Sequence, residues 1–350
     1  MEFNVNAWLR PNVLRMKPYS SARDEFSGSE GIFLDANENS LGSVGIAEYY
    51  NRYPDPLQKN LKLKLAQIEN IPPDWIFLGN GSDEAIDLVI RAFCEPAQDQ
   101  VIILPPTYGM YQVSAHLNNV GVLEVPLLPN FQLDVDRIIA SFSPQTKILF
   151  ICSPNNPSGN LMHRGDLEKV IQNFPGIVLL DEAYVDFAPG FSLISALKEY
   201  PNLIIIKTFS KAWGLAGLRL GVAFAQPEII RVFNKIKPPY NINLLTQEVA
   251  LKALEKPEIK AQMLEEIFSE KLFLEEQLYK QKEVLKIFPS SANFLLVQFR
   301  EADRMYDYLV SKQIIVRNRS KVLYCEGCLR ITVGTHSENV ALLKAIEAYT

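Results

Sequence analysis

Histidine is scarce in this chain of 350 residues, which contains only three: His116, His163 and His336. Any reaction that needs a histidine as its acid or base must therefore use one of these three residues. Cysteine is scarce as well, with four residues in the whole chain. That density suits a reducing compartment rather than a framework of disulfides, so we expect a cytoplasmic protein.

Long apolar runs and a strong charge of one sign are also missing. The longest apolar runs, such as 177–180 and 203–206, are far too short to cross a bilayer. The first residues do not combine a basic stretch with an apolar core, so no secretory signal is expected. The net charge is -5 at pH 7, and a mildly acidic chain binds polyanions poorly. We therefore expect neither a membrane nor nucleic acid as the main partner.

Two of the cysteines, Cys325 and Cys328, form an isolated CxxC motif. A zinc site needs a second pair of ligands at suitable spacing, and the sequence contains none. A thioredoxin-like role needs the motif near the start of a βαβ unit, whereas here it precedes a strand expected at 329–333. We interpret the pair as reduced structural cysteines and predict no metal site.

Short apolar segments alternate with longer amphipathic segments between about residues 75 and 225. The apolar segments are 75–78, 101–104, 121–125, 147–152, 177–180, 203–207 and 220–224. Because these runs are continuous, they predict strands that are buried on both faces. The segments between them have helical patterns, as in 82–93, where Ser82 is expected to cap the helix. Strands that alternate with helices predict an α/β fold with a mainly parallel sheet.

The pattern changes after Pro238 and Pro239. Segments 243–254 and 258–280 are charged, rich in leucine and periodic near 3.6, which predicts long helices separated by Pro257. The elements expected after them are a strand at 293–299, a helix at 302–311, strands near 314–317 and 329–333, and a helix at 337–349. This α+β pattern predicts a second, smaller domain. The first 30 residues have little pattern and are expected to pack as an arm on other elements.

Lys211 follows one of the expected strands, in the sequence Thr208-Phe209-Ser210-Lys211. Ligands of open α/β sheets bind at the carboxyl ends of the strands. A lysine at such a place is partly desolvated, which lowers its pKa and makes the nucleophilic amine accessible, as a Schiff base requires. By itself, the pattern also fits a surface lysine that happens to end a strand.

Two further segments are suited to binding an anion. Arg219 lies in Gly217-Leu218-Arg219-Leu220-Gly221, where the guanidinium can hold a phosphate and the glycines allow a close approach of the backbone. Gly79-Asn80-Gly81-Ser82-Asp83-Glu84 is expected to join a strand to a helix N-terminus, which attracts anions. This turn has only the first two glycines of a dinucleotide fingerprint and no GKS or GKT sequence. It therefore suits one phosphate better than a dinucleotide or a triphosphate.

Polar side chains follow two other expected strands. Asp181-Glu182-Ala183-Tyr184 comes after 177–180, where a buried carboxylate needs a cationic partner. A protonated pyridine nitrogen would be such a partner, and Tyr184 could reach a second substituent of the ring; a helix cap or a magnesium ligand is the alternative. In Ser153-Pro154-Asn155-Asn156-Pro157-Ser158-Gly159, Asn156 can donate to an oxygen and Asn156-Pro157 can be cis, although a plain turn would explain the loop as well.

Four of these motifs, taken together and in order, resemble the fold-type I aminotransferases that use pyridoxal 5′-phosphate (PLP). The motifs are Asn156-Pro157-Ser158-Gly159, Asp181-Glu182-Ala183-Tyr184, Ser210-Lys211 and Gly217-Leu218-Arg219-Leu220-Gly221. The set is specific although its members singly are not, and the resemblance covers nearly the whole chain. Further stretches narrow it to the class II histidinol-phosphate aminotransferases. They are Pro18-Tyr19-Ser20-Ser21-Ala22-Arg23, Leu34-Asp35-Ala36-Asn37-Glu38-Asn39, Asn51-Arg52-Tyr53-Pro54-Asp55-Pro56, Pro106-Thr107-Tyr108-Gly109 and Leu329-Arg330-Ile331-Thr332-Val333-Gly334-Thr335.

The resemblance implies an α/β fold with a three-layer α/β/α large domain, a mostly parallel seven-stranded sheet, and a smaller α+β domain. It implies an N-terminal arm and part of the small domain in 1–40, the large PLP-binding domain in 41–255 and the small C-terminal domain in 256–350. It also implies a homodimer in which Tyr53 reaches the PLP phosphate of the neighbouring subunit. The implied reaction belongs to histidine biosynthesis and converts L-histidinol phosphate and 2-oxoglutarate to imidazole-acetol phosphate and L-glutamate.

The resemblance also implies a role for each residue of the PLP site. Lys211 bonds to the cofactor and then moves the proton between the substrate Cα and the C4′ atom of the cofactor. Asp181 pairs with the pyridine nitrogen, and Asn156 and Tyr184 bind the phenolic oxygen. Tyr108 stacks on the ring. The residues implied to hold the phosphate are Gly81, Ser82, Asp83, Thr208, Ser210 and Arg219.

The substrate residues implied by the resemblance come from both ends of the chain. Arg330, supported by Arg317, would bind the substrate phosphate or the carboxylate of glutamate. Tyr19 and Asn37 would line the substrate pocket. The sequence departs from the family pattern at Ser40, where proline is usual, and at Asn318, where aspartate is common.

Other functions compatible with these motifs lie inside and outside the aminotransferases. An aromatic amino-acid aminotransferase and a PLP-dependent decarboxylase of a phosphorylated amino acid have the same fold. A non-catalytic PLP-binding regulator is usually fused to a helix-turn-helix, and this chain has no basic N-terminal domain that could serve as one. A nucleotide-binding protein would bind its ligand without a covalent chromophore.

Overall fold

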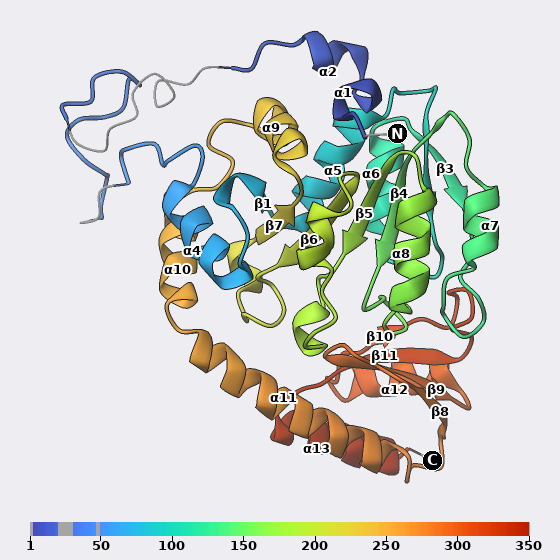
Figure 1. Cartoon of the computed structure of the whole chain (residues 1–350). Helices are drawn as coiled ribbons and strands as arrows, with labels where there is room; N and C mark the ends of the chain where they lie inside the picture. Colours follow the sequence, from blue (N-terminus) through green and yellow to red (C-terminus); the bar gives the residue numbers. More distant parts are fainter. Residues whose placement is uncertain (1–2, 20–30, 47–49, 350) are drawn as a thin grey trace.

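The computed structural model describes residues 3–19, 31–46 and 50–349. A seven-stranded sheet lies at the centre of the larger part of the molecule, and a four-stranded sheet lies in a smaller part below it (Figure 1). The order of the large sheet is β1-β7-β6-β5-β4-β2-β3. Strand β7 pairs antiparallel with β1 and with β6, and the other neighbouring pairs are parallel. The predicted, mainly parallel α/β sheet is therefore confirmed.

Each strand of the large sheet coincides with one of the apolar segments of the sequence. The strands are β1 (Ile76–Asn80), β2 (Gln100–Ile103), β3 (Gly121–Glu124), β4 (Thr146–Cys152), β5 (Ile177–Asp181), β6 (Leu203–Thr208) and β7 (Leu220–Phe224). Strands β5 and β7 are buried over their whole length. Continuous apolar runs are expected for strands covered on both faces, and here helices cover both faces.

Two hydrophobic cores lie on opposite faces of this sheet. On one face pack α5 (Ser82–Phe93), α6 (Met110–Leu117) and α9 (Pro227–Ile236). On the other face pack α4 (Lys59–Glu69), α7 (Val135–Ala140), α8 (Arg164–Asn173) and α10 (Leu244–Leu254). Neighbouring residues of β5 alternate between the two cores, Leu179 facing the first and Leu180 the second. This arrangement gives the three α/β/α layers.

Two short helices, α1 (Val5–Trp8) and α2 (Pro11–Arg15), begin the described chain. Val5 and Val13 belong to the core that contains α5 and α9, and Arg10 donates its backbone N–H to Ala92 O of α5 at 3.0 Å. Figure 1 shows both helices at the end of the molecule far from the four-stranded sheet. They pack on the larger part, as the expected arm would, and not with the smaller part to which 1–40 was partly assigned. The domain boundaries at 40 and 255 stay predictions.

The smaller part follows a long helix. Its elements are α11 (Pro257–Leu278), β8 (Val284–Phe288), β9 (Phe294–Phe299), α12 (Ala302–Ser311), β10 (Arg317–Asn318), β11 (Cys328–Thr332) and α13 (His336–Glu347). The sheet is antiparallel in the order β10-β11-β9-β8. Helix α11 begins at Pro257, which confirms the predicted break after α10. Strand β8 was not predicted, and β10 is only two residues long.

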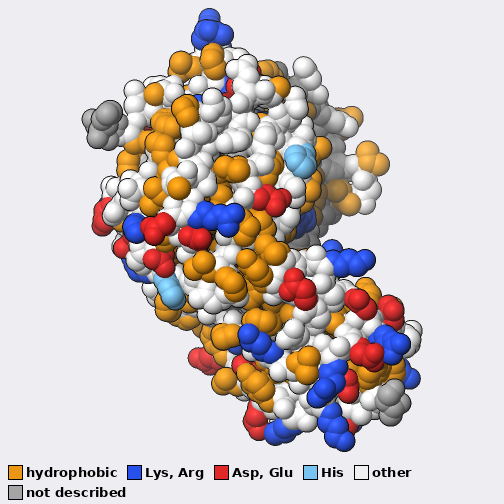
Figure 2. Space-filling view, turned by 90° about the vertical axis from the view of Figure 1, so that its right-hand side faces the viewer, with side chains coloured by type: hydrophobic (Ala, Val, Ile, Leu, Met, Phe, Trp, Pro, Cys, Tyr) orange, Lys and Arg blue, Asp and Glu red, His pale blue; other side chains and the backbone are white. Residues whose placement is uncertain are grey.

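Short 3₁₀ segments connect several of these elements: η1 (Pro73–Trp75), η2 (Val185–Phe187), η3 (Ile194–Lys198) and η4 (Ala216–Leu218). In the face shown in Figure 2, basic and acidic side chains are interspersed over the smaller part of the molecule. No helix of the described ranges has both the length and the apolar character that crossing a membrane requires.

Candidate active site

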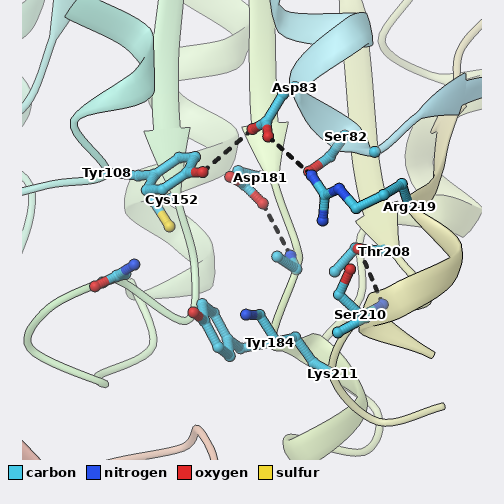
Figure 3. A pocket seen from close by; sticks show the side chains of 14 residues that line it. Ser82, Asp83, Tyr108, Cys152, Asp181, Tyr184, Thr208, Ser210, Lys211 and Arg219 are labelled. Carbon is cyan, nitrogen blue, oxygen red and sulfur yellow. Dashed lines mark hydrogen bonds and ion pairs between the residues drawn. The ribbon is translucent and has the colours of Figure 1, made fainter. Parts of the chain in front are cut away.

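The motif-bearing loops meet at one pocket, at the carboxyl ends of β4, β5 and β6 (Figure 3). The pocket contains about 620 Å³ of empty space, part of it open to solvent. Helix α5 reaches it with its N-terminus. The lining residues are Gly81, Ser82, Asp83, Tyr108, Cys152, Asn156, Asp181, Ala183, Tyr184, Thr208, Ser210, Lys211, Ala216 and Arg219.

Every residue predicted for the cofactor lines this pocket except Tyr53. Residues far apart in the sequence come together because parallel strands end at the same edge of a sheet. Cys152, Ala183 and Ala216 also line the pocket and were not predicted. None of the three histidines is among the lining residues, and all three are exposed. The pocket thus assembles the predicted residues, while the role of each stays a prediction.

Lys211 lies in the loop that follows β6. Burial, and then the charges of Arg330 and Arg219, lower the pKa of its amine. The Nζ atom lies 5.6 Å from the centroid of the Tyr184 ring, and Figure 3 shows the two side chains next to each other. A lowered pKa increases the neutral fraction of the amine, so Lys211 is suited to act as a nucleophile and as a base.

Asp181 ends β5 and is almost fully buried, with an exposed fraction of 3%. Burial raises the pKa of its carboxyl group to about 6. One oxygen accepts from the Ala183 backbone N–H at 2.9 Å, and the other accepts from the Tyr111 hydroxyl at 2.7 Å. Lys211 is the weakest of the influences that lower this pKa. A buried carboxylate without a close cation favours a ligand that brings a positive charge.

Tyr111 of α6 is a site residue that the sequence did not reveal. Its side chain is fully buried, and its ring stacks on Phe150 with the centroids 4.8 Å apart and the planes inclined by 8°. The ring of Tyr108 lies nearly perpendicular to that of Tyr111, with the centroids 5.6 Å apart. These contacts fix the hydroxyl that donates to Asp181. The sequence gives no sign of this contact, because Tyr108 precedes α6 and Tyr111 lies within it.

Replacing Tyr111 with phenylalanine removes the donor and keeps the ring. Because the hydrogen bond lowers the pKa of Asp181, we expect that pKa to rise further above about 6 in Tyr111→Phe. A hydrogen bond to a charged group contributes about 1.5–3 kcal/mol, which corresponds to an upward shift of about one to two pH units. The acidic limb of the pH dependence of PLP binding reports this shift. In the control Tyr200→Phe, which loses only a bond to Gln172, the limb should stay in place.

The N-terminus of α5 lies against Arg219. The N-cap residue is Gly81, which makes no side-chain cap, and Ser82 is the first helical residue. The prediction that Ser82 caps the helix is therefore wrong, and its hydroxyl faces the pocket instead. Gly81 has a φ of +76°, and a Cβ atom there would lie 2.8 Å from Arg219 Nη2. A Cβ atom at Gly221 would lie 2.1 Å from Ser82 N, so β7 can approach the helix this closely only because residue 221 is glycine.

Arg219 and three hydroxyl groups lie on one side of the pocket, as Figure 3 shows. Arg219 Nη2 is 3.3 Å from Asp83 Oδ2, and the Tyr108 hydroxyl donates to Asp83 Oδ1 at 3.2 Å. The hydroxyl groups belong to Ser82, Thr208 and Ser210. A helix N-terminus, a guanidinium and several hydroxyls form a set that suits a phosphate.

Arg330 adjoins the pocket from the smaller part of the molecule. It donates from Nη1 to the Oδ1 atom of Asn156, and its guanidinium lies 5.2 Å from the centroid of the Phe294 ring. The Asn156–Pro157 peptide bond is cis, as the sequence allowed. Arg317 is exposed and lies opposite Arg330 in the register of β10 and β11. The smaller sheet thus supplies Arg330 to one edge of the pocket.

Tyr53, Asn37 and Tyr19 lie outside the pocket. Tyr53 and Asn37 line a separate cavity, where Tyr53 stacks on Tyr240 with the centroids 4.4 Å apart. Tyr19 is 75% exposed and lines another cavity with Lys237. In a single chain these three predicted residues therefore do not reach the pocket.

All four cysteines are free and buried. Burial raises the pKa of Cys325 to about 12 and that of Cys328 to about 12, so both thiols are protonated and unreactive at neutral pH. In the part of the chain that the structure describes, no three His, Cys, Asp or Glu residues form a group that could hold a metal ion.

Known proteins resemble this chain over nearly its whole length. The family model of aminotransferase class I and II matches residues 32–346. The chain is 53% identical over 349 residues to the histidinol-phosphate aminotransferase of Cytophaga hutchinsonii, covering 100% of both chains. It is 54% identical over 339 residues to the enzyme of that name from Parabacteroides distasonis, covering 97% of both.

Solved structures share the fold. The histidinol-phosphate aminotransferase from Sinorhizobium meliloti, in complex with pyridoxal-5′-phosphate, matches with a TM-score of 0.79 at 23% sequence identity. The match covers 89% of this chain and 88% of that chain. It confirms the predicted fold, with its mostly parallel seven-stranded sheet between layers of helices.

Proposed function

The chain belongs to the class I and II aminotransferases, and we propose that it transfers the amino group of L-histidinol phosphate to 2-oxoglutarate with PLP as its cofactor. The products are imidazole-acetol phosphate and L-glutamate, in a step of histidine biosynthesis. The observation that carries this proposal is the pocket in which Lys211, Asp181 and Arg219 converge. Identity above 50% over the full length to relatives of that name supports the substrate.

The pocket fits PLP at three separate points. The buried carboxyl group of Asp181, with its raised pKa, matches a protonated pyridine nitrogen. The N-terminus of α5, Arg219 and the hydroxyls beside it match a phosphate. Lys211, with its lowered pKa, matches an aldehyde that needs an amine nucleophile. When bound, PLP supplies an electron sink for the negative charge that develops at the substrate Cα.

Each of the other steps of the reaction is assigned to residues of the pocket. Lys211 holds the cofactor before substrate binds, and then takes the Cα proton and returns a proton on the cofactor side. Asp181, held by Tyr111, keeps the ring nitrogen protonated. Tyr184 and Asn156 would hold the ring through its phenolic oxygen, and Tyr108 would pack against it. No histidine is needed in this assignment.

Arg330, supported by Arg317, binds the anionic group of each substrate. Histidinol phosphate has no α-carboxylate, whereas glutamate has one, so the two half-reactions present different anions. A guanidinium can bind a phosphate or a carboxylate through two parallel hydrogen bonds. One arginine at the edge of the pocket can therefore serve both half-reactions, and the bond between Arg330 and Asn156 supports this position.

The function is tested by a single half-reaction. Protein loaded with PLP and mixed with histidinol phosphate, without a keto acid, should convert the colour of bound PLP to that of its amine form. Phenylalanine at the same concentration should react far more slowly. A faster reaction with phenylalanine would establish an aromatic aminotransferase instead, and release of carbon dioxide from a phosphorylated amino acid would establish a decarboxylase.

The enzyme acts as a homodimer in this proposal, and Tyr53 of one subunit reaches the PLP phosphate of the other. Tyr53 is 51% exposed and does not line the pocket of its own chain. Large apolar side chains nearby are more exposed still, Leu41 and Val44 at 95% each. A second copy of the chain would cover these side chains, and Asn37 and Tyr19 would act on substrate in that assembly.

Replacing Tyr53 with phenylalanine should weaken PLP binding about 10-fold, because one hydrogen bond to a charged phosphate is lost. The rate at saturating PLP should change little. Equilibrium titration with PLP measures the first effect, and sedimentation establishes whether the chain is a dimer. Tyr50→Phe, at the same cavity, is the control and should bind PLP as the wild type does. A fully active monomer would contradict the shared site.

The cytoplasm is the compartment that we propose for the enzyme. All four cysteines are free and buried, and the two with pKa values near 12 have no disulfide partner in the described structure. Such cysteines suit a compartment in which thiols stay reduced. The location of a tagged full-length chain in fractionated cells tests this proposal.

A further inference from the structure

The side chains of three arginines project from one face of the small sheet, beside the pocket. Arg317 lies opposite Arg330 in the register of β10 and β11, and the Arg319 backbone N–H donates to Cys328 O at 2.9 Å. Because side chains alternate along a strand, Arg317, Arg319 and Arg330 project from the same face. Leu329, on the other face, packs in the core of the smaller part, whereas Cys328 packs in a core of the larger part. The arginines therefore face the larger part, which carries the pocket.

The surroundings of Arg319 are positive. After burial, the charges of Arg330 and Arg317 have the largest effects on the Arg319 pKa, and both lower it. The groups with the opposite effect are Cys325 and Tyr184, whose own pKa values near 12 leave them neutral at pH 7. Within the described ranges, no carboxylate lies within ion-pair distance of any of the three guanidiniums.

Arg319 also has an unused hydrogen-bond donor. Its Nε atom is buried and has no partner among the described residues. The hydroxyl oxygen of the next residue, Ser320, is buried and unpartnered as well. Buried polar groups in folded proteins are nearly always hydrogen-bonded, so a free donor within a cluster of like charges calls for a ligand. Since the whole cluster is cationic, that ligand must be an anion.

We propose that Arg319 is a third anion-binding residue of the substrate site, which makes the site selective for a phosphate monoester over a carboxylate. This rests on the proposed function and extends it to a residue with no assigned role. A phosphate monoester carries about -1.5 to -2 at pH 7 and has three terminal oxygens, whereas a carboxylate carries -1 and has two. Two guanidiniums satisfy the carboxylate, and the third acts only on the phosphate.

The test compares the two half-reactions in Arg319→Gln. With histidinol phosphate, we expect kcat/KM to fall roughly 10- to 100-fold, mainly through KM, because a charge-assisted hydrogen bond is lost. With glutamate, and with unphosphorylated histidinol, we expect changes of less than about 3-fold. Arg319→Lys should recover part of the loss. The matched control is Arg304→Gln, an exposed arginine of α12 outside the cluster, which should behave as the wild type.

Inorganic phosphate gives a readout that does not depend on turnover of histidinol phosphate. As a competitive inhibitor of the glutamate half-reaction, it should bind about 10-fold more weakly to Arg319→Gln than to the wild type. PLP affinity and circular dichroism should be unchanged, which excludes a general loss of structure. Equal losses for glutamate and histidinol phosphate would overturn the proposal, as would no loss with either.

The experiments distinguish a wrong role for Arg319 from a wrong proposed function. If the wild type converts another amino acid and ignores histidinol phosphate, the function is wrong. Weaker inhibition of Arg319→Gln by phosphate would then still support the anion site. If the wild type converts histidinol phosphate and Arg319→Gln does so equally well, the function stands and the role of Arg319 is wrong.

Discussion

Replacing Lys211 with alanine is expected to lower turnover of histidinol phosphate and 2-oxoglutarate by roughly 10⁴-fold, at the upper end of what a general acid or base contributes. Lys211 is the amine in the pocket whose pKa is lowered by burial and by two neighbouring arginines. In the proposed function Lys211 takes the Cα proton and returns it, so its loss removes that base. Steady-state kinetics at saturating PLP measure the loss.

Borohydride provides a second measurement on the same variant. Reduction should fix PLP permanently to the wild-type chain, and peptide mass spectrometry should find the added mass at Lys211. The Lys211→Ala chain should release its PLP after the same treatment. Lys280→Ala removes an exposed lysine paired with Glu276 and serves as the control, with wild-type activity. Full turnover by Lys211→Ala would refute the assignment of this residue.

The large sheet could be predicted because its strands are buried on both faces. Leu203, Ile204 and Ile205 of β6 have no exposed surface, and such continuous apolar runs stand out in a sequence. Strand β8 has a weaker pattern, since Leu285 is 52% exposed and Lys286 interrupts the run. It lies at an edge of the small sheet, where one row of backbone groups and much of the strand surface remain uncovered.

The pocket could be predicted as far as its residues follow strands. Asp181 is the last residue of β5, and Lys211 and Asn156 follow β6 and β4 within four residues. These positions bring all three to one edge of the sheet. Tyr111 could not be found in this way, because its partner Asp181 is 70 residues away in the sequence. The cationic face of β10 and β11 also needs the structure, since it depends on the register of a strand only two residues long.

Tyr53 and Asn37 could not be placed in the site by their position in the chain. Neither follows a strand of the large sheet; only the family resemblance assigned Tyr53 to the site of a neighbouring subunit and Asn37 to the substrate pocket. In the structure of one chain they share a cavity with Tyr240, apart from the pocket. An interface between chains leaves no local pattern that distinguishes it from a surface of exposed apolar residues.

Replacing Asp181 with asparagine should weaken PLP binding by roughly 100- to 4,000-fold, because it leaves a cationic ring nitrogen buried without its counter-charge. The corresponding free energy is about 3–5 kcal/mol, as found when one partner of a buried ion pair is removed. The substitution preserves shape, and the amide oxygen can still accept from Tyr111 or Ala183. Asp186→Asn, which affects a partly exposed pair with Lys260, is the control and should bind PLP normally.

The pH dependence separates the loss of charge from a loss of structure. In the wild type, burial raises the pKa of Asp181 to about 6, so the carboxylate form predominates above that pH and the neutral form below it. PLP affinity should therefore fall as the pH drops through about 6. Asparagine does not ionise, so Asp181→Asn should bind weakly at every pH and lack this acidic limb. A variant that retained the limb would show that another group controls it, and that Asp181 is not the counter-charge of the ring.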